Sequence, residues 1–539
     1  MTRRAARCLS AVVLVLGALA APASAHDHLG GGSGGAAGAS NDWQSMSLEY
    51  FDANTQAITS DIAFWDDTAF VGNYNGMRSY NIADPDDPVR LADFQCYGPQ
   101  NDPSVWDTSG DGQADLMVLS VDRTLIGPAC GTSATATAHD NPAGWEGIRL
   151  FDVSNPAAPV QLKSIYLDCG SHTNTMYPDL ARNRLVVLIS SYPLRPGPTC
   201  GPVNGPAAGR DPLHGVIQTV FIPLAGNPAA SAAGATEGPE LPINYPGDPD
   251  NQYKPSEHGL SGPGIVDGMR ACHDIAVYMP RKLVTGACAE QSQQWRIKDE
   301  TGLPDTANPV WVFDQPNIDF HHSATLSWDG KITNIIDESF GSGCPTVTPG
   351  VGQTGRMFFL DTGSGSRLSQ FMIRRNHKKE ELDYCSAHLG NVVPSSNRYL
   401  LVNAWYTGGV DVIDFSNPRA PKEVAYYDVD GDEWSGYWYE QNGTSNTGPL
   451  NVFGTHGVEH VAGGPPHNAG ARGFEAFLAD VAANRSTLDH LNPQVQERAF
   501  QTTIDRKAQT ARASRTARAS TARSSGRVNR RAALNRLAP

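Results

Sequence analysis

One pattern recurs three times in this chain, and it limits the fold more than any other feature. Each copy is a short apolar strand, then an Asp or Asn turn containing two prolines, then a second short alternating strand. The first strand and the turn of each copy lie at residues 76–88, 147–159 and 409–421, and the second strand follows. Proline presets the φ angle of such a turn, and Asn or Asp caps it with a local side-chain hydrogen bond. Many short strands with repeated turn signals predict an all-β fold of the β-propeller class.

The repeat also gives a register, which predicts seven four-stranded blades between residues 43 and 465. The innermost strand of each blade should begin at one equivalent position, and residues 45–51 should supply the outer strand that closes the ring. The seven equivalent positions are Ser60, Asn101, His172, His273, His322, His388 and Trp434. The composition agrees, because 54 Gly and 38 Pro in 539 residues supply many turns.

The repeats resemble those of the LVIVD-repeat family of exported bacterial proteins. The resemblance covers roughly residues 44–465 and is clearest at residues 60–65, 320–330, 410–414 and 434–439. It implies a propeller and an exported location, and it supplies no catalytic residue.

The amino-terminal end predicts export as well. Residues 1–25 carry three arginines, an apolar run at 11–21 and small residues at 23–25, which is the pattern of a secretory signal peptide. A Gly-rich linker follows at 26–42. We therefore expect a secreted protein that is extracellular or associated with the cell surface.

The carboxy-terminal end carries a charge block. Residues 466–505 are predicted to form a short helical extension, with helices at 473–483 and 493–504. Residues 506–539 hold ten Arg or Lys and no acid, and we expect a disordered basic tail. The tail could bind anionic wall polymer or lipid, or simply be solvated.

The chain as a whole has a formal charge of -15, so the propeller is not expected to bind nucleic acid. We also expect a monomer.

Eight cysteines stay after the signal is removed, and an even number in an exported chain predicts four disulfides. Because strands alternate in direction, the connections that precede each inner strand lie on the same face as the connections between second and third strands. We call this the top face. All eight cysteines map to it, beside expected insertions at 123–145, 192–214, 289–308 and 340–354. The predicted pairs are Cys96–Cys130, Cys169–Cys200, Cys272–Cys288 and Cys344–Cys385.

Four histidines share the start of the inner strand in consecutive blades, so they should converge on the central channel. They are His172, His273, His322 and His388. Neutral imidazoles are common ligands of Zn, Cu and Fe, and the sequence therefore predicts an axial transition-metal site. The alternative is structural, because duplication of a repeat also copies its capping residues. His321 competes with His322 for the inward direction. Further polar groups that could contact the metal ligands or a substrate are Asp274, Asp337, Glu338 and Trp405.

One acidic loop resembles the calcium loops of integrin-type propeller repeats. Oxygen-bearing side chains alternate around Gly112, at Asp107, Ser109, Asp111, Gln113 and Asp115. Such a loop can wrap a Ca²⁺ ion, although Ser109 replaces the usual Asp or Asn. The alternative is an ordinary acidic glycine turn.

These features predict an exported binding module whose top face holds a ligand, namely a small molecule, a peptide or a cell-wall component. The alternative is a metal-dependent extracellular enzyme, oxidative or hydrolytic, that uses the four histidines. A third class is a surface-attachment protein held by its basic tail. The signatures of zinc proteases, serine hydrolases, P-loop enzymes and dinucleotide-binding enzymes do not occur in the sequence.

Overall fold

A computed structural model describes residues 47–53, 57–84, 87–131, 145–191, 215–258, 267–339, 355–373, 386–395, 398–406, 408–427, 433–438, 450–454, 457–462, 490–500, 507 and 510–514. The predicted signal peptide and linker lie outside these residues. In the described part of the chain, no helix is long and apolar enough to cross a membrane.

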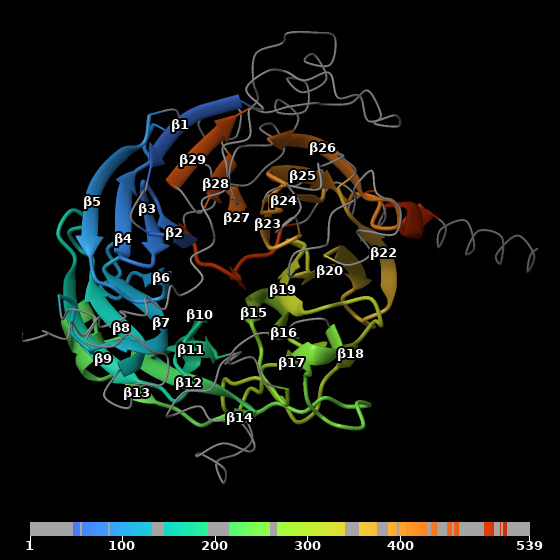
Figure 1. Cartoon of the computed structure of the whole chain (residues 1–539), viewed down its shortest axis with the longest axis horizontal. Coiled ribbons are helices and arrows are strands. Elements are labelled where there is room, and N and C mark those ends of the chain that lie inside the picture. Colours follow the sequence, from blue (N-terminus) through green and yellow to red (C-terminus); the bar gives the residue numbers. More distant parts are fainter. Residues whose placement is uncertain are drawn as a thin grey trace, which may run out of the picture.

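The described residues form an all-β propeller, in which six mainly antiparallel sheets are arranged around a central axis (Figure 1). We call the region along this axis, between the innermost strands, the channel. The first contains β2 (Thr59–Trp65), β3 (Thr68–Asn73), β4 (Gly76–Asn81) and β5 (Val89–Gln95), and the second contains β6 (Gln100–Trp106), β7 (Leu116–Ile126), β8 (Trp145–Asp152) and β9 (Val160–Tyr166). The third contains β10 (Thr173–Asp179), β11 (Arg184–Ser190) and β12 (Val216–Pro223), which pairs with both β13 (Thr236–Glu237) and β14 (Leu241–Pro242).

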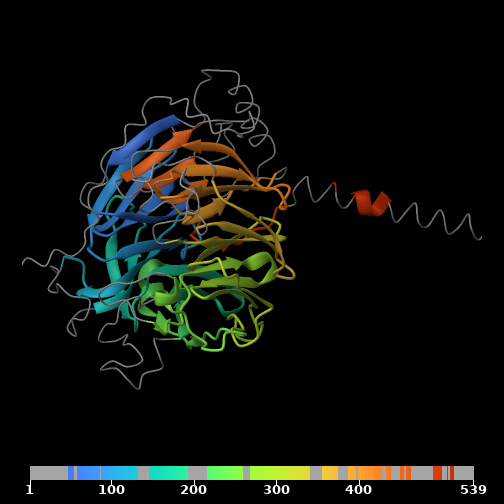
Figure 2. The ribbon, with the colours of Figure 1, turned by 45° about the vertical axis from the view of Figure 1, so that its right-hand side comes forward.

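The remaining sheets follow in chain order around the ring, as the view turned by 45° also shows (Figure 2). The fourth contains β15 (Asp274–Tyr278), β16 (Leu283–Cys288), β17 (Gln291–Arg296) and β18 (Trp311–Phe313), and the fifth contains β19 (His321–Leu326), β20 (Ile332–Asp337), β21 (Met357–Asp361) and β22 (Arg367–Phe371). The sixth joins, in order, β1 (Ser47–Ala53), β29 (Gly457–Ala462), β28 (Leu450–Gly454), β27 (Glu433–Trp438), β23 (Leu389–Val392), β24 (Leu400–Ala404), β25 (Val410–Asp414) and β26 (Lys422–Tyr427). The described helices between the strands are short: α1 (Pro228–Ala233) and the 3₁₀ turns η1 (Leu180–Arg182), η3 (Pro255–His258) and η4 (Met279–Arg281).

The expectation of seven separate blades is wrong, because six sheets form the ring and the last of them has eight strands. Its two halves are joined by their innermost strands, β23 and β27, which run parallel with Leu389 opposite Ser435 and Gly390 opposite Gly436. A Cβ atom on Gly390 would lie 2.5 Å from the carbonyl oxygen of Val402, and one on Gly436 would lie 3.0 Å from the Val402 Cγ1. Glycine at both positions therefore lets β23 and β27 lie close to β24, the strand that contains Val402. The predicted closing strand is present as β1, which pairs with β29.

Burial changes from the channel outward within each sheet. Every residue of the inner strands β2, β10, β15 and β19 is buried, whereas the outer strands β5 and β9 are mostly exposed or half-buried. The apolar side chains of neighbouring sheets pack against one another, for example Leu150 of β8 with Val187 of β11. The ring is thus held by contacts between sheets, which surround the channel with rigid strands.

The repeated proline turns connect third to fourth strands, as predicted. The Asp152 and Asn155 side chains accept hydrogen bonds from the Ser154 and Ala157 backbone N–H groups. Equivalent bonds cap the turn after β25 at Asp414. The local capping expected from the sequence therefore sets these turns.

The insertion expected at 289–308 is wrong. Strand β17 begins at Gln291, directly after a short connection from Cys288, so the long connection comes one strand later, between β17 and β18. The polar stretch at 291–294 falls within that expected insertion, but its four residues are buried in β17. For example, Ser292 Oγ lies 2.8 Å from His321 Nδ1.

Residues 490–500, here called the strap, cross the centre of the ring (Figure 1), and the helix expected from residue 493 is wrong over this range. Strand β30 (His490–Leu491) pairs with the end of β2, and β31 (Val495–Gln496) pairs in parallel with the end of β15. Between them, the Asn492 side chain hydrogen-bonds both backbone groups of Val105 near the end of β6. Gln496 Nε2 donates to the Leu326 carbonyl at the end of β19. Because these are the last residues of inner strands, the strap lies at the face opposite the top.

The basic tail is described only at residue 507 and at 510–514, where 510–514 form a helical turn rather than the disordered chain expected there. Within this turn Ser514 Oγ donates to the Thr510 carbonyl. The helix predicted at 473–483 lies outside the described residues.

Candidate metal centre in the central channel

The four predicted histidines lie together at the top of the channel. His172, His273 and His388 each precede the first residue of an inner strand, and His322 is the second residue of β19. Successive ring centroids are 4.5, 3.8 and 4.3 Å apart in the order His172, His273, His322, His388. All four side chains are buried, so the inner strands bring the rings into one continuous cluster.

His322, rather than His321, faces the channel. The pairing of β19 with β20 shifts register between His321 and Ser323, which marks an irregularity at His322. Irregularities of this kind redirect a side chain. His321 turns away from the channel and contacts Ser292 and Phe313 of the fourth sheet.

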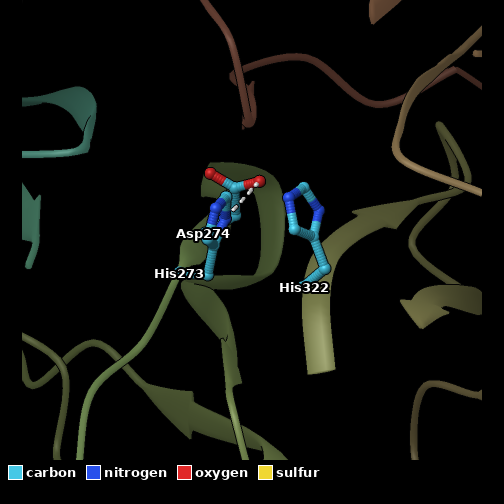
Figure 3. Close-up of side chains that lie close together, drawn as sticks. All are labelled: His273, Asp274 and His322. Carbon is cyan, nitrogen blue, oxygen red and sulfur yellow. Dashed lines mark ion pairs between the residues drawn. The ribbon is translucent and has the colours of Figure 1, made fainter. Parts of the chain in front are cut away.

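Two carboxylates complete the cluster. His273 Nδ1 lies 3.5 Å from Asp274 Oδ2, beside the His322 ring (Figure 3). His322 Nε2 lies 3.6 Å from Glu338 Oε2, and His388 Nε2 lies 4.0 Å from Glu338 Oε1. Two sets of three residues therefore have ligand atoms within 4.8 Å of one another: His273, Asp274 and His322, and His322, Glu338 and His388. A tetrahedral ion with bonds of about 2.1 Å separates its ligand atoms by about 3.4 Å, which is close to these distances.

Burial sets the protonation of this cluster. It lowers the pKa of His172 to about 4 and that of His273 and His388 to about 3, and it holds the pKa of His322 well below its usual range. At neutral pH these imidazoles are uncharged and can offer lone pairs to a metal. Burial also raises the pKa of Glu338 to about 7. In the described part of the chain, the ion pairs of Glu338 involve only histidines, so a bound cation would supply the missing positive charge.

His172 differs from the other three because side chains occupy both of its ring nitrogens. Its Nδ1 lies 3.0 Å from Asp122 Oδ2, and its Nε2 lies 2.5 Å from Gln100 Nε2. The sequence analysis missed Gln100 and Asp122. A left-handed backbone at Gln100 and Asn101, with φ of 72° and 50°, turns Gln100 toward His172, whereas Asn101 hydrogen-bonds backbone carbonyls of the first sheet.

The sequence analysis also missed two buried acids, Asp61 and Asp102. Tyr437 Oη donates to Asp61 Oδ1 at 3.3 Å, and the Asn174 backbone N–H donates to Asp102 Oδ2 at 2.7 Å. Burial and the nearby carboxylates raise the pKa of Asp61 to about 8 and that of Asp102 well above its usual range. A signal existed, because Asp follows the predicted strand start in three blades, at Asp61, Asp102 and Asp274.

Asp61→Asn is expected to flatten the dependence of stability on pH. A folded-state pKa near 8 means that the folded protein keeps a proton that the unfolded chain releases above about pH 4, so the free energy of unfolding falls as the pH rises between these values. Asn keeps the acceptor for Tyr437 and does not titrate, so this fall should be smaller by on the order of 1–3 kcal/mol between pH 5 and pH 8. Thermal unfolding of the metal-free protein across this pH range measures the effect. Parallel curves for the two proteins would contradict it.

Two other predicted polar groups are structural. Asp337 accepts hydrogen bonds from the backbone N–H groups of Asp319, Phe320 and Gly355, and Trp405 Nε1 donates to Asp411 Oδ1. Both side chains are fully engaged in holding strands together and do not join the histidines.

The acidic loop predicted to bind calcium connects β6 to β7, on the face opposite the histidines. Asp107 Oδ1 and Oδ2 accept hydrogen bonds from the Gly110 and Gly112 backbone N–H groups, and Asp115 Oδ2 accepts one from Ser109. Asp111 similarly accepts one from the Gln113 backbone. The loop is not among the described groups of acidic and histidine side chains that come close enough to hold an ion, and the calcium site stays a prediction.

Two of the predicted disulfides are present, Cys96–Cys130 and Cys272–Cys288. Cys169 is also disulfide-bonded. Its expected partner lies outside the described residues, as do the members of the fourth expected pair and the insertions at 192–214 and 340–354. The disulfides present fix top-face connections beside inner strands.

Fold and site together define a β-propeller with a buried cluster of histidines and carboxylates at the top of its channel. No protein-family model matches the chain, and no curated protein matches it. The chain is similar to a solved structure from Bacteroides uniformis ATCC 8492 that is proposed to be a 6-phosphogluconolactonase, with 10% identity and a TM-score of 0.43 over 73% of this chain and 89% of that one.

Two further solved structures are similar at the same level. The WD40 β-propeller domain of Doa1 has 9% identity and a TM-score of 0.41 over 79% of this chain and 98% of that one. A protein from Lactobacillus plantarum has 10% identity and a TM-score of 0.41 over 74% and 92%. These similarities are too distant to carry an argument about function, and the resemblance to LVIVD-repeat proteins stays a prediction.

Proposed function

We propose that this chain is an exported β-propeller that binds a transition-metal ion in its axial histidine cluster and presents that ion to a ligand at the top face. One observation carries the proposal. His322 is 1% exposed, and neither of its ring nitrogens makes a hydrogen bond of normal length. A buried polar group without a partner is costly, and proteins rarely keep one without a reason. A metal ion bound to Nε2, which lies 3.6 Å from Glu338 Oε2, would supply the missing partner of that nitrogen.

The donor set supports the same proposal. Uncharged imidazoles and carboxylates suit Zn, Fe and Cu, and the cluster offers both within a few ångströms. When bound with an open coordination position, such an ion polarises a water molecule or a carbonyl group. This is the chemistry that the enzymatic alternative, oxidative or hydrolytic, would need.

The disulfides support the proposed exported location, because such bonds form and persist in oxidising compartments.

We also propose that the basic tail acts as the contact with anionic wall polymer or lipid. Release of the protein into the medium after deletion of 506–539 supports that part of the proposal, and unchanged fractionation contradicts it.

Calorimetric titration of the metal-stripped full chain with Zn²⁺ tests the metal site. We expect about one ion per chain with micromolar or tighter affinity, and a loss of at least about 100-fold in His322→Ala, because removal of a ligand leaves the ion under-coordinated. His490→Gln is the matched control, since His490 lies on the strap, stacked on Trp65 at the other end of the channel. No binding by the wild type, or equal binding by His322→Ala, would contradict the proposal.

A further inference from the structure

Two sets of three ligands share His322, and the orientation of their side chains distinguishes them. We infer that the ion is bound by His322, His388 and Glu338, and that Tyr406 is a positioning residue that turns the Glu338 carboxylate toward it. This inference rests on the proposed function and names the site within it.

His388 is fixed in the form that a metal ligand needs. Its Nδ1 lies 2.5 Å from the Trp434 carbonyl oxygen, which can only accept a hydrogen bond. The proton must therefore be on Nδ1, and the lone pair on Nε2 faces Glu338. The ring is held on both sides, by Tyr406 at 4.4 Å and Trp434 at 4.7 Å between centroids. A backbone carbonyl on the second ring nitrogen is the usual way in which proteins orient a histidine ligand.

Glu338 is oriented by one hydroxyl group. Tyr406 Oη donates to Glu338 Oε1 at 2.5 Å, and Glu338 Oε2 lies 3.6 Å from His322 Nε2. Tyr406 has a left-handed backbone with φ of 50°, which a non-glycine residue rarely adopts. Two backbone hydrogen bonds with Glu433 hold it in this conformation. The strained backbone thus places the hydroxyl at the carboxylate.

His172 is not expected to be a ligand, because Asp122 and Gln100 occupy its two nitrogens. Among the described residues, no hydrogen bond of normal length orients the Asp274 carboxylate as Tyr406 orients that of Glu338, and Asp274 Oδ2 lies 3.5 Å from Nδ1 of its chain neighbour His273. Two nitrogens and one carboxylate from the remaining residues leave coordination positions for water or a ligand, a donor set typical of Zn²⁺ or Fe²⁺ sites.

The test uses the metal-stripped full chain, Zn²⁺ for affinity and Co²⁺ for its visible spectrum. Tyr406→Phe keeps the ring beside His388 and removes only the hydroxyl, so the dissociation constant for Zn²⁺ should rise about 10-fold or more and the Co²⁺ spectrum should change. Glu338→Gln should raise the dissociation constant for Zn²⁺ further. The dissociation constant of Asp274→Asn should stay within about threefold of the wild-type value. Tyr399→Phe is the control, because Tyr399 Oη makes the same kind of bond to Asp329, at 2.7 Å, away from the histidines.

The outcomes separate this inference from the proposed function. If the wild type binds neither ion, the proposed function fails and the inference fails with it. If the wild type binds but Tyr406→Phe matches Tyr399→Phe in affinity and spectrum, the role of Tyr406 is overturned. If Asp274→Asn loses binding while Glu338→Gln keeps it, the ion belongs to the other set and the site assignment is overturned.

Discussion

Asn492→Ala is expected to lower the free energy of unfolding by about 2–4 kcal/mol, because the substitution leaves two buried backbone groups without partners. Val105 N–H donates to Asn492 Oδ1 at 2.7 Å, and Asn492 Nδ2 donates to the Val105 carbonyl at 2.8 Å. The asparagine is 2% exposed, so water cannot replace these bonds in the folded state. Alanine removes both at once from a segment that fastens four inner strands.

Guanidinium unfolding of the full chain measures this loss. Asn417→Ala is the control, since Asn417 caps an exposed turn through one hydrogen bond to Arg419 N–H and should cost at most about 1 kcal/mol. Zinc affinity should be unchanged in Asn492→Ala, because the strap and the histidines lie at opposite ends of the inner strands. Equal stability of the two variants would show that the strap does not fasten the ring.

Arg149→Ala is expected to lower the free energy of unfolding by about 3–5 kcal/mol, because it truncates a large buried side chain and removes the hydrogen bonds that its guanidinium donates. The guanidinium is 1% exposed and donates to the carbonyls of Tyr97, Gly127 and Pro128, and it lies over the Trp145 ring at 5.2 Å. Burial lowers the pKa of Arg149 to about 10, so it still carries its charge at neutral pH. Without it the Tyr97 and Gly127 carbonyls lose this donor, whereas the Pro128 carbonyl still accepts from Gln161 and Ser164.

Arg149→Lys provides the comparison, because an ammonium group cannot reproduce the planar fork of donors and should recover only part of the loss. The Cys96–Cys130 disulfide lies against the same side chain, so it should be reduced faster by dithiothreitol in Arg149→Ala. Unfolding curves and reduction rates equal to those of the wild type would contradict this role.

The register of the ring could be predicted from the sequence because the proline turns recur at a fixed place in each repeat. That register places the four histidines at equivalent starts of inner strands. Because these starts surround the central axis, the side chains were expected to converge on it. The register also predicts the pairs Cys96–Cys130 and Cys272–Cys288, and both disulfides are present. The proline turns were therefore sufficient to predict the positions of residues that recur at the same place in each repeat.

The sequence could not predict features that depend on distant contacts. The strap pairs with strand ends more than 150 residues away, and nothing local to residues 490–500 indicates those free edges. The polar residues of β17 look like a loop until Ser292 and its neighbours meet partners on adjacent sheets. The parallel pairing of β23 with β27 brings Gly390 opposite Gly436 only in the folded ring. The orienting roles of Trp434 and Tyr406 likewise depend on the geometry of the channel.

Elemental analysis of protein purified from its exported fraction, without affinity tags or chelators, tests the central claim most directly. His322→Ala, purified in the same way, is measured beside it. We predict about one Zn, Fe or Cu ion per wild-type chain and none in the variant, because His322 belongs to both possible ligand sets. Calcium alone, or the same metal content in both proteins, would contradict an axial metal centre.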